Sequence, residues 1–188
     1  FHSIYAFARL ADDVADEAEL KFSPDDRIKS LNKLGECLSL LQNSEDINNP
    51  IFLALKDTIE KKELPLLPFQ KLLEAFKMDV NFVQPNDFED LERYCFYSAN
   101  PIGELVLRLF DEYNEKSAKF SDMICTGLQL ANFWQDLSRD LPNGRIYIPK
   151  IVLENVKLTT EDLFLMRKRE NIEICLKELI EKTKWYFL

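Results

Sequence analysis

The sequence predicts an all-α protein, and three observations lead to this fold class. Apolar residues recur mostly at spacings of three and four, which is the period of a helix. Glycine is scarce, with four residues in 188, and no alternating stretch rich in valine and isoleucine indicates a strand. Hydrophobic residues make up 46% and charged residues 30%, a composition typical of one globular domain with a sizeable core.

Spacing, start signals and stop signals together predict seven or eight helices. The predicted spans are residues 2–18, 25–42, 50–61, a helix that follows LPLLPFQ and ends near 83, 87–110 with an interruption, 117–140, and one or two more from 159 onward. Ser23 and Pro24 are a start signal, with serine as N-cap and proline in the first turn. Pro101 lacks a backbone donor and predicts the interruption near Asn100. The turn sequence LPNGR ends the 117–140 helix.

The net charge, the cysteines and the chain ends limit the kinds of protein that this sequence could be. A net charge of -9 argues against a nucleic-acid binder, which would present a basic face. Four widely spaced cysteines indicate reduced, mostly buried thiols in a cytoplasmic protein. No apolar run is long enough for a membrane span, and no signal peptide is visible. Because the chain begins at Phe1 and stops at KWYFL without a cap signal, we expect a piece of a longer protein.

The stretch RLADDVADE gathers four carboxylates within six positions. Asp12 and Asp16 are four residues apart, as are Asp13 and Glu17, so each is a like-charge pair that costs a helix roughly 0.2–0.5 kcal/mol. Arg9 offsets part of this repulsion. One interpretation is a solvated acidic face. The other is half of a cation site, which the apolar and aromatic flanking sequence favours.

A second motif, QLANFWQDLSRDLPNGR, places amide and carboxylate side chains along one helix face. The members of this stripe, spaced three, four and four, are Gln129, Asn132, Asp136 and Asp140. Such hard oxygen ligands suit Mg²⁺, and the neighbouring Arg139 and Arg145 suit phosphate. Two Asp-xxx-Asp motifs about 120 residues apart on separate predicted helices indicate a Mg²⁺-diphosphate site far more strongly than either motif alone.

A third motif, YCFYSANPIG, combines aromatic and small residues on the interrupted helix. Tyr94 and Tyr97 could face a cavity, and Ala99 and Gly103 leave room for a bulky group or a close helix contact. Ordinary core packing is one interpretation. The other is a hydrophobic channel whose aromatic faces stabilise a carbocation.

These three motifs, in this order and spacing, resemble the squalene/phytoene synthase family over essentially the whole chain. SANP and NFWQD are similar to the bacterial squalene or hydroxysqualene synthase branch of hopanoid pathways. The resemblance implies an isoprenoid synthase-type helical bundle with a central cavity. Residues 1–188 would then be a single isoprenoid synthase domain, truncated at both ends. Family members condense two farnesyl or geranylgeranyl diphosphates and rearrange the product, and the hydroxysqualene branch ionises presqualene diphosphate.

The resemblance also assigns roles to individual residues. The implied Mg²⁺ ligands are Asp12, Asp16, Asn132, Asp136 and Asp140. The implied substrate-binding residues are Arg9, Gln129, Arg145, Tyr147, Ala99 and Gly103, of which the two arginines and Gln129 would contact diphosphate. Tyr5 and Tyr94 would be catalytic and lie near the reacting carbons. We expect no NADPH requirement, because no glycine-rich dinucleotide motif is present. We expect no obligate protein partner, and lipophilic products allow a loose association with a membrane.

Departures from the family pattern leave alternatives open. Gln135 stands where many members have an arginine, and Glu104 where the branch often has one. Segments expected before Phe1 and after Leu188 are absent, so this piece by itself could be inactive. A phytoene synthase that acts on geranylgeranyl diphosphate is one alternative, and a non-catalytic relative that assists assembly is another. A di-iron bundle would need paired histidines, and the chain has only His2.

Overall fold

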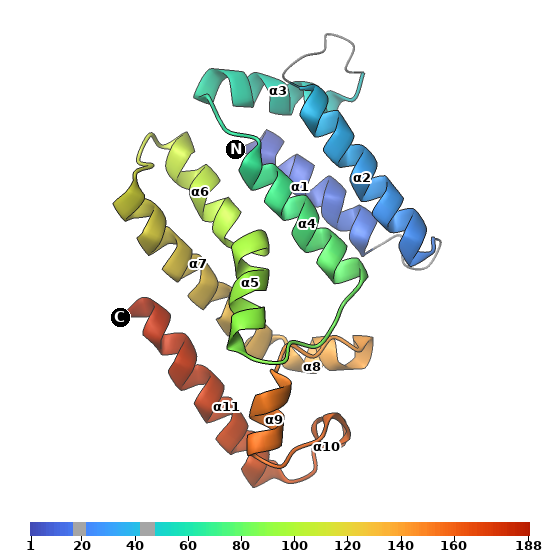
Figure 1. The fold of residues 1–188 in the computed structure, drawn as a ribbon, viewed down its shortest axis with the longest axis vertical. Helices are drawn as coiled ribbons and strands as arrows, with labels where there is room; N and C mark the ends of the chain where they lie inside the picture. The colour runs from blue at the N-terminus through green and yellow to red at the C-terminus, as the bar shows by residue number, and fades with distance from the viewer. Residues whose placement is uncertain (17–21, 42–47) are drawn as a thin grey trace. The chain divides into compact units, whose positions relative to one another are not determined.

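The structure, a computed structural model, describes residues 1–16, 22–41 and 48–188. Within these ranges the chain forms α-helices and short 3-10 turns and no strand, so the predicted all-α class is confirmed (Figure 1). The helices are α1 (His2–Ala15), α2 (Pro24–Leu40), α3 (Pro50–Lys62), α4 (Leu67–Val80), α5 (Phe88–Ser98), α6 (Asn100–Leu109), α7 (Glu115–Gln135), α8 (Leu137–Asp140), α9 (Lys150–Asn155), α10 (Thr160–Phe164) and α11 (Arg169–Lys184).

The chain divides into two compact units. Unit 1 comprises Phe1–Asn81 and Pro101–Ala118, and unit 2 comprises Phe82–Asn100 and Lys119–Leu188. Each unit is built from two separate stretches of sequence. The prediction of a single domain over 1–188 stays a prediction.

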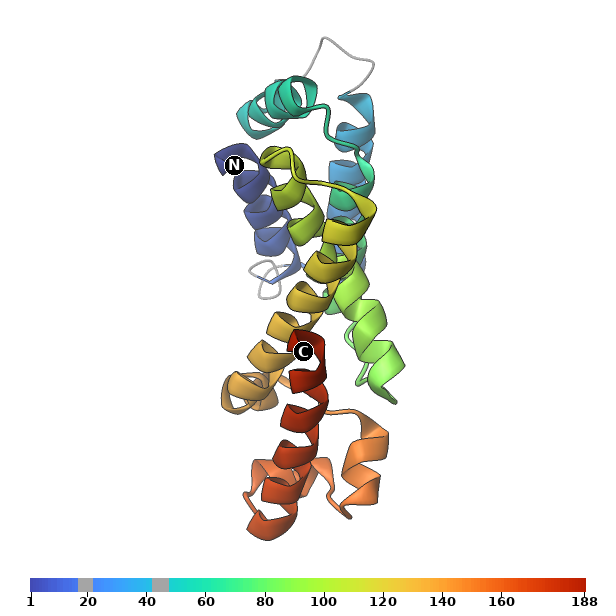
Figure 2. The same cartoon turned by 90° about the vertical axis from the view of Figure 1, so that its left-hand side faces the viewer.

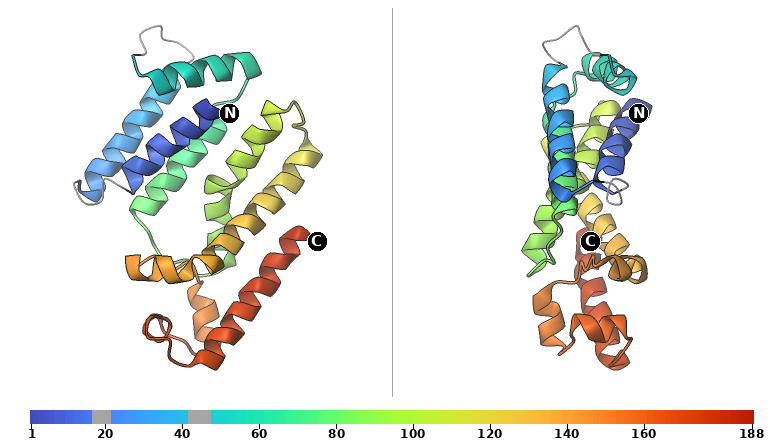
Figure 3. Two further views of the ribbon diagram at one scale, coloured as in Figure 1. Left: turned by 180° about the vertical axis from the view of Figure 1, so that it is seen from behind. Right: turned by 90° about the vertical axis from the view of Figure 1, so that its right-hand side faces the viewer.

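Unit 1 is organised around α1, which packs against α2, α3 and α4 (Figure 3). Phe7 is fully buried there and meets two other rings edge-on, Phe52 at 5.8 Å and Phe69 at 5.6 Å between centroids. Arg27 of α2 is buried as well, and its guanidinium donates to the Ala15 carbonyl at 2.6 Å. This bond satisfies one of the carbonyls that the end of α1 leaves without an intrahelical partner.

Unit 2 contains two apolar clusters. One surrounds α9, α10 and α11, which Figure 2 shows close together, and the other joins Leu91 and Cys95 of α5 to Leu130 and Phe133 of α7. The helices α7 and α11 are also joined by the Trp134 indole, which donates to the Thr183 hydroxyl at 2.8 Å. The Trp134 side chain is partly buried, and this bond gives its ring N–H a partner and links the two helices.

Most helix boundaries agree with the predictions to within a few residues. The Ser23 cap is confirmed, since its hydroxyl accepts the Asp26 N–H at 3.2 Å, and the interruption falls at Ala99, between α5 and α6. The single helix over 117–140 is wrong, because α7 ends at Gln135 and α8 begins at Leu137. The short α9 was not predicted, and the described ranges hold more helices than the expected seven or eight. Parts of three predictions lie outside the described residues. They are the end of the first helix at residues 17–18, the end of the second helix at Gln42, and the carboxylate of Glu17.

The cysteines and the helix lengths bear on two further predictions. All four cysteines are free; Cys95 and Cys175 are buried, Cys125 is partly buried and Cys37 is exposed. Burial raises the pKa of the Cys95 thiol to about 12 and that of Cys175 to about 11. Across the described ranges, none of the helices combines the length and the apolar character needed to cross a bilayer.

Candidate active site

The first acidic motif occupies the last turn of α1. The buried side chains of this helix, set at helical spacing, are Ile4, Phe7, Ala11 and Ala15. They turn the carboxylates away from the core, so that Asp12 and Asp13 are partly exposed and Asp16 is exposed. Asp16 caps the helix, and its N–H donates to the Asp12 carbonyl at 2.9 Å. The motif therefore presents its carboxylates at one edge of unit 1.

Arg9 holds two of these carboxylates. Its guanidinium lies 2.9 Å from Oδ2 of Asp12 and 2.8 Å from Oδ1 of Asp13. The last turn of α1 contains no basic residue, although a helix C-terminus carries partial negative charge and favours cations. Three carboxylates at that end repel one another and the helix dipole. This donor set fits the predicted Mg²⁺ role of Asp12 and Asp16.

The second motif keeps its spacing through the break between α7 and α8. The Asp136 N–H donates to the Asn132 carbonyl at 2.8 Å, and the Asp140 N–H donates to the Asp136 carbonyl at 3.0 Å. Both are bonds to the fourth residue before, as in a continuous helix. Asn132 is exposed, while Asp136 and Asp140 are partly buried, as is Gln129 one turn earlier. Sequence spacing thus predicted the stripe although it missed the break.

A tight turn brings Arg145 back to this stripe. Gly144 has φ of 72°, in the left-handed region that glycine adopts at low cost, and its N–H bonds the Leu141 carbonyl at 3.0 Å. The Arg145 N–H then donates to the Asp140 carbonyl at 3.1 Å. The LPNGR sequence was predicted as a turn, and its effect is to return a cation to the carboxylates.

The two carboxylates of this stripe, Asp136 and Asp140, are only partly neutralised by the arginines beside them. Burial raises the pKa of Asp140, and the neighbouring Asp136 carboxylate raises it further, while Arg145 and Arg139 act in the opposite direction. Arg139 is mostly exposed and lies 3.7 Å from Asp136. The two carboxylates therefore repel each other despite the arginines. A cation between them would relieve this repulsion, which fits the predicted Mg²⁺ ligands in unit 2.

Two of the predicted tyrosines meet in unit 2. Tyr147 stacks on Phe133, with centroids 3.8 Å apart and planes inclined by 11°, and Tyr94 lies 6.0 Å from Tyr147 and 5.8 Å from Phe133. Phe82 meets Tyr147 edge-on at 5.2 Å. Phe133 and Phe82 were not predicted as members of this group. Neither carries a chemical signal in the sequence, since a phenylalanine at helical spacing is usually core.

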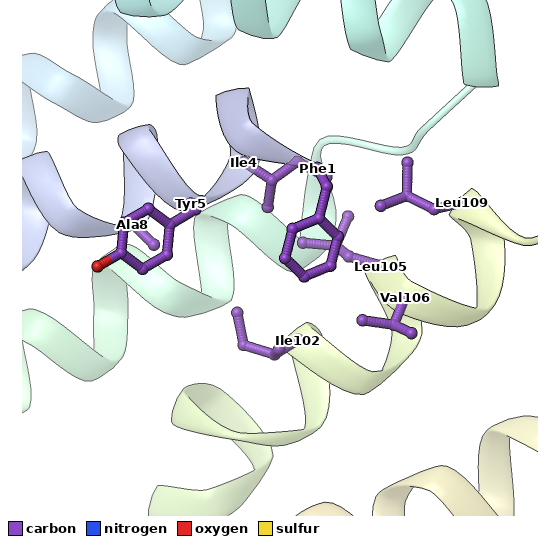
Figure 4. Close-up of a pocket in the computed structure, with 8 residues that line it drawn as sticks. All are labelled: Phe1, Ile4, Tyr5, Ala8, Ile102, Leu105, Val106 and Leu109. Carbon is purple, nitrogen blue, oxygen red and sulfur yellow. The ribbon is translucent and has the colours of Figure 1, made fainter.

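Tyr5 lines a different feature, a small apolar cavity in unit 1 of about 90 Å³ (Figure 4). The lining side chains come from the start of the chain and α1 and from α6, and they are Phe1, Ile4, Tyr5, Ala8, Ile102, Leu105, Val106 and Leu109. The Tyr5 hydroxyl is the one polar side-chain atom drawn in this lining. The cavity is smaller than the ~300 Å³ or more of pockets that bury a whole drug-sized ligand. It could hold part of an apolar chain.

The remaining predicted residues have simple surroundings. Ala99 caps the end of α5 and is partly buried, and Gly103 is buried in α6. Glu104, the departure from the family pattern, pairs with Arg108 at 2.8 Å within α6. Among the residues that the structure describes, no three acidic, thiol or imidazole side chains gather into a ready metal site. The first motif belongs to unit 1 and the second to unit 2, so their meeting across one cavity stays a prediction.

Comparisons with known proteins agree with the sequence motifs. The profile of the squalene/phytoene synthase family matches residues 1–188. A hydroxysqualene synthase of Sinorhizobium fredii is 32% identical over 185 residues, which cover 97% of this chain and 60% of that protein. A phytoene synthase of Mycobacterium tuberculosis is 30% identical over 162 residues, covering 85% of this chain and 52% of the other. The chain thus spans about half to three fifths of the length of these relatives.

A solved structure shows the same fold. The squalene synthase HpnC from Alicyclobacillus acidocaldarius superposes with a TM-score of 0.90 at 37% identity, and the match covers 100% of this chain and 69% of that one. The predicted isoprenoid synthase-type helical fold is confirmed by this likeness. The central cavity that the prediction included stays a prediction.

Proposed function

Because the chain belongs to the squalene/phytoene synthase family, we propose that it is part of a Mg²⁺-dependent enzyme that ionises a prenyl diphosphate. The product would be squalene or hydroxysqualene for hopanoid or other triterpenoid synthesis, from farnesyl or presqualene diphosphate. The observation that carries this proposal is the Asp136–Asp140 pair, which is mutually repelled, partly buried and flanked by two arginines. Such a pair is costly unless a cation and an anionic substrate occupy the space beside it.

Each acidic motif would supply some of the ligands that bind Mg²⁺. Mg²⁺ usually takes one or two carboxylates and completes its shell with water and substrate phosphates. Asp12 and Asp16 would supply one such set, and Asp136 and Asp140, with the Asn132 amide, the other. When bound, the metal neutralises the charge of the leaving diphosphate.

The other residues would bind and orient the substrate. The Arg145 and Arg9 guanidinium groups present paired N–H donors that match phosphate oxygens, and Gln129 adds an amide. The apolar cavity beside Tyr5 would hold part of the prenyl chain and keep water away from the carbocation. The Tyr94 ring, set against Phe133 and Tyr147, presents an aromatic face that stabilises positive charge.

A phytoene synthase activity is the second candidate, because one of the relatives at 30% identity bears that name. The two activities differ in the length of the prenyl chain, from farnesyl to geranylgeranyl. We also propose a cytoplasmic enzyme without NADPH dependence that associates loosely with membranes, because its products are lipophilic.

Product analysis of the full-length protein tests these proposals. Farnesyl, geranylgeranyl and presqualene diphosphates are supplied separately with Mg²⁺, with and without NADPH. Asp12→Asn and Asp136→Asn should each reduce turnover by orders of magnitude. Asp57→Asn is the matched control, since this carboxylate lies on α3 and pairs with Lys61 at 2.8 Å.

Three outcomes would contradict specific parts. Unchanged turnover in both aspartate variants would remove the metal assignment. Consumption of geranylgeranyl diphosphate alone would favour the phytoene synthase, and stimulation by NADPH would contradict the cofactor proposal. No consumption of any of the three substrates by the wild type would favour a non-catalytic relative.

A further inference from the structure

The hydroxyl of Ser98 in unit 2 is shielded from solvent and unpaired. Ser98 is the last residue of α5, and its side-chain oxygen finds no hydrogen-bond partner among the residues that the structure describes. A hydroxyl in a helix commonly donates to the carbonyl four residues before it. Other helical hydroxyls of this chain do so at 2.8–3.0 Å, and they are Ser30, Ser39, Thr58 and Thr183. Ser98 makes no such bond to the Tyr94 carbonyl, so its hydroxyl keeps its full capacity for a bound molecule.

The surroundings of this hydroxyl are apolar and aromatic. A helical side chain lies over the turn before its own residue, and for Ser98 that turn carries Tyr94 and Cys95. Cys95 is fully buried in the apolar cluster that joins α5 to α7, and Tyr94 packs against this cluster. An unpaired hydroxyl in such a place is costly until it gains a partner. The partner that suits it is small and neutral, because a single hydroxyl among apolar groups does not balance a charge. Water meets this description, since it both donates and accepts hydrogen bonds.

Hydrogen bonds fix the backbone just after Ser98. The Ala99 N–H donates to the Cys95 carbonyl at 2.9 Å and closes the last turn of α5. The Asn100 amide oxygen then accepts the Thr126 hydroxyl at 3.1 Å, and Thr126 is only 5% exposed. This second bond ties the chain after Ser98 to α7. The Ser98 hydroxyl is therefore carried by a backbone that two helices hold in place, which is what the positioning of a reactant needs.

The spacing along α5 relates this hydroxyl to the proposed reaction. Ser98 follows Tyr94 by four residues, so the two side chains lie on one face of the helix. The Tyr94 ring is the group proposed above to stabilise the carbocation. A carbocation that receives no hydride, as in an enzyme without NADPH, is consumed either by capture of water or by loss of a proton. The outcome depends on whether a water molecule is held beside the cation or kept away from it.

We propose that the Ser98 hydroxyl holds the water molecule that captures the carbocation, an inference that rests on the proposed function and selects an alcohol as its product. The water oxygen forms the new C–O bond with one of its lone pairs. The proton that this oxygen then loses passes to the diphosphate anion released in the ionisation step, so atoms and charge balance. Ser98 acts on the cation only through the water, which makes it a positioning residue that sets the product.

The ratio of two products tests this role in the full-length protein. Wild type, Ser98→Ala and Ser98→Thr are each supplied with farnesyl or presqualene diphosphate and Mg²⁺ in isotopically labelled water, without NADPH. The wild type should release an alcohol whose oxygen carries the label. Ser98→Ala should lower the ratio of this alcohol to the hydrocarbon formed by proton loss about fivefold, which corresponds to one neutral hydrogen bond of about 1 kcal/mol. Substrate consumption should stay close to that of the wild type, because ionisation precedes capture. Ser98→Thr keeps a hydroxyl and should restore most of the alcohol.

Ser121→Ala is the matched control. Ser121 is also a partly buried serine of unit 2, but its hydroxyl has a partner, the Cys125 thiol at 3.9 Å. This variant should keep the product ratio of the wild type, and unchanged unfolding midpoints would show that all variants fold. A wild-type product ratio in Ser98→Ala would overturn the inference.

The behaviour of the wild type separates the inference from the proposed function. Consumption of substrate with release of hydrocarbon alone would overturn the role of Ser98 and leave the proposed ionisation of a prenyl diphosphate standing. An alcohol without the label would likewise overturn the capture of water. No consumption of any prenyl diphosphate would overturn the proposed function, and the inference with it.

Discussion

Replacement of Asp140 by asparagine should stabilise the metal-free protein while it removes a metal ligand. Asp136 and Asp140 form a like-charge pair four residues apart, and burial adds to the penalty on the charged form of Asp140. Removal of such a repulsion is worth roughly 0.2–0.5 kcal/mol in a helix, and the relief of desolvation brings the expected gain to about 0.5 kcal/mol. For a chain of 188 residues this corresponds to an increase in Tm of about 1–2 °C.

The same substitution at Asp90, Asp90→Asn, should lower the stability of the protein instead of raising it. The Asp90 carboxylate accepts the Asn86 N–H at 2.9 Å and contacts Arg93 at 2.6 Å, and its bonds to Asn86 and the charge of Arg93 lower its pKa. These contacts favour the charged form, so Asp90→Asn should cost about 0.5–1.5 kcal/mol, reduced by the exposure of Arg93. The two variants therefore distinguish a carboxylate whose charge destabilises the metal-free fold, Asp140, from one whose charge stabilises it, Asp90.

Equilibrium unfolding measures both effects. The wild type, Asp140→Asn and Asp90→Asn are unfolded by urea in a chelator, and again with Mg²⁺ and inorganic diphosphate. Wild type and Asp90→Asn should gain stability from the added ligands, because ligands that bind only the folded state stabilise it. Asp140→Asn should gain much less. The reasoning would be refuted if Asp140→Asn lost as much stability as Asp90→Asn, or gained as much as the wild type from Mg²⁺ and diphosphate.

Two further predictions concern stability away from the active site. Phe7→Ala should cost about 3–5 kcal/mol in urea unfolding, because it removes a fully buried ring together with its edge-on contacts to Phe52 and Phe69, and a cost below ~1 kcal/mol would show that unit 1 repacks. Asp162 has its pKa lowered to about 2, chiefly by the Lys168 hydrogen bond, so its stabilising contribution is present above its ordinary value of 3.8 and is lost as pH falls toward about 2. Asp162→Asn should flatten the loss of stability across that pH range, and a pH profile identical to that of the wild type would contradict this role.

Local signals predicted the parts of the fold that depend on neighbouring residues. The Ser23 cap, the interruption before Pro101 and the turn at Gly144 each arise from a few adjacent residues, and each is found in the structure. The break at Asp136 was missed because apolar periodicity continues across it and the backbone bonds on either side keep helical spacing. Three residues of the 157–168 segment adopt left-handed φ without glycine, which no propensity would predict.

In the candidate site, too, features set by local spacing were predictable and features set by the folding of distant segments were not. The stripe that includes Asp136 and Asp140 follows from helical spacing alone, and the structure keeps it. The stacking of Tyr147 on Phe133 was not predictable, because it depends on how the segment after Gly144 folds back against α7. Arg9 pairs with Asp12, three residues away, and with Asp13, four residues away, and both contacts agree with helical spacing.

The cysteines differ in exposure, so their rates of reaction with a thiol reagent can report local opening of the fold. Cys37 on α2 is exposed, so a thiol reagent reaches it in the native protein. Cys95 on α5 is buried and, with its pKa raised to about 12, remains a poorly nucleophilic thiol until its surroundings open. Alkylation of Cys95 is therefore limited by the opening of the apolar cluster around α5 and α7. Its rate would measure how often unit 2 opens under native conditions, with a cysteine already present in the chain as the probe.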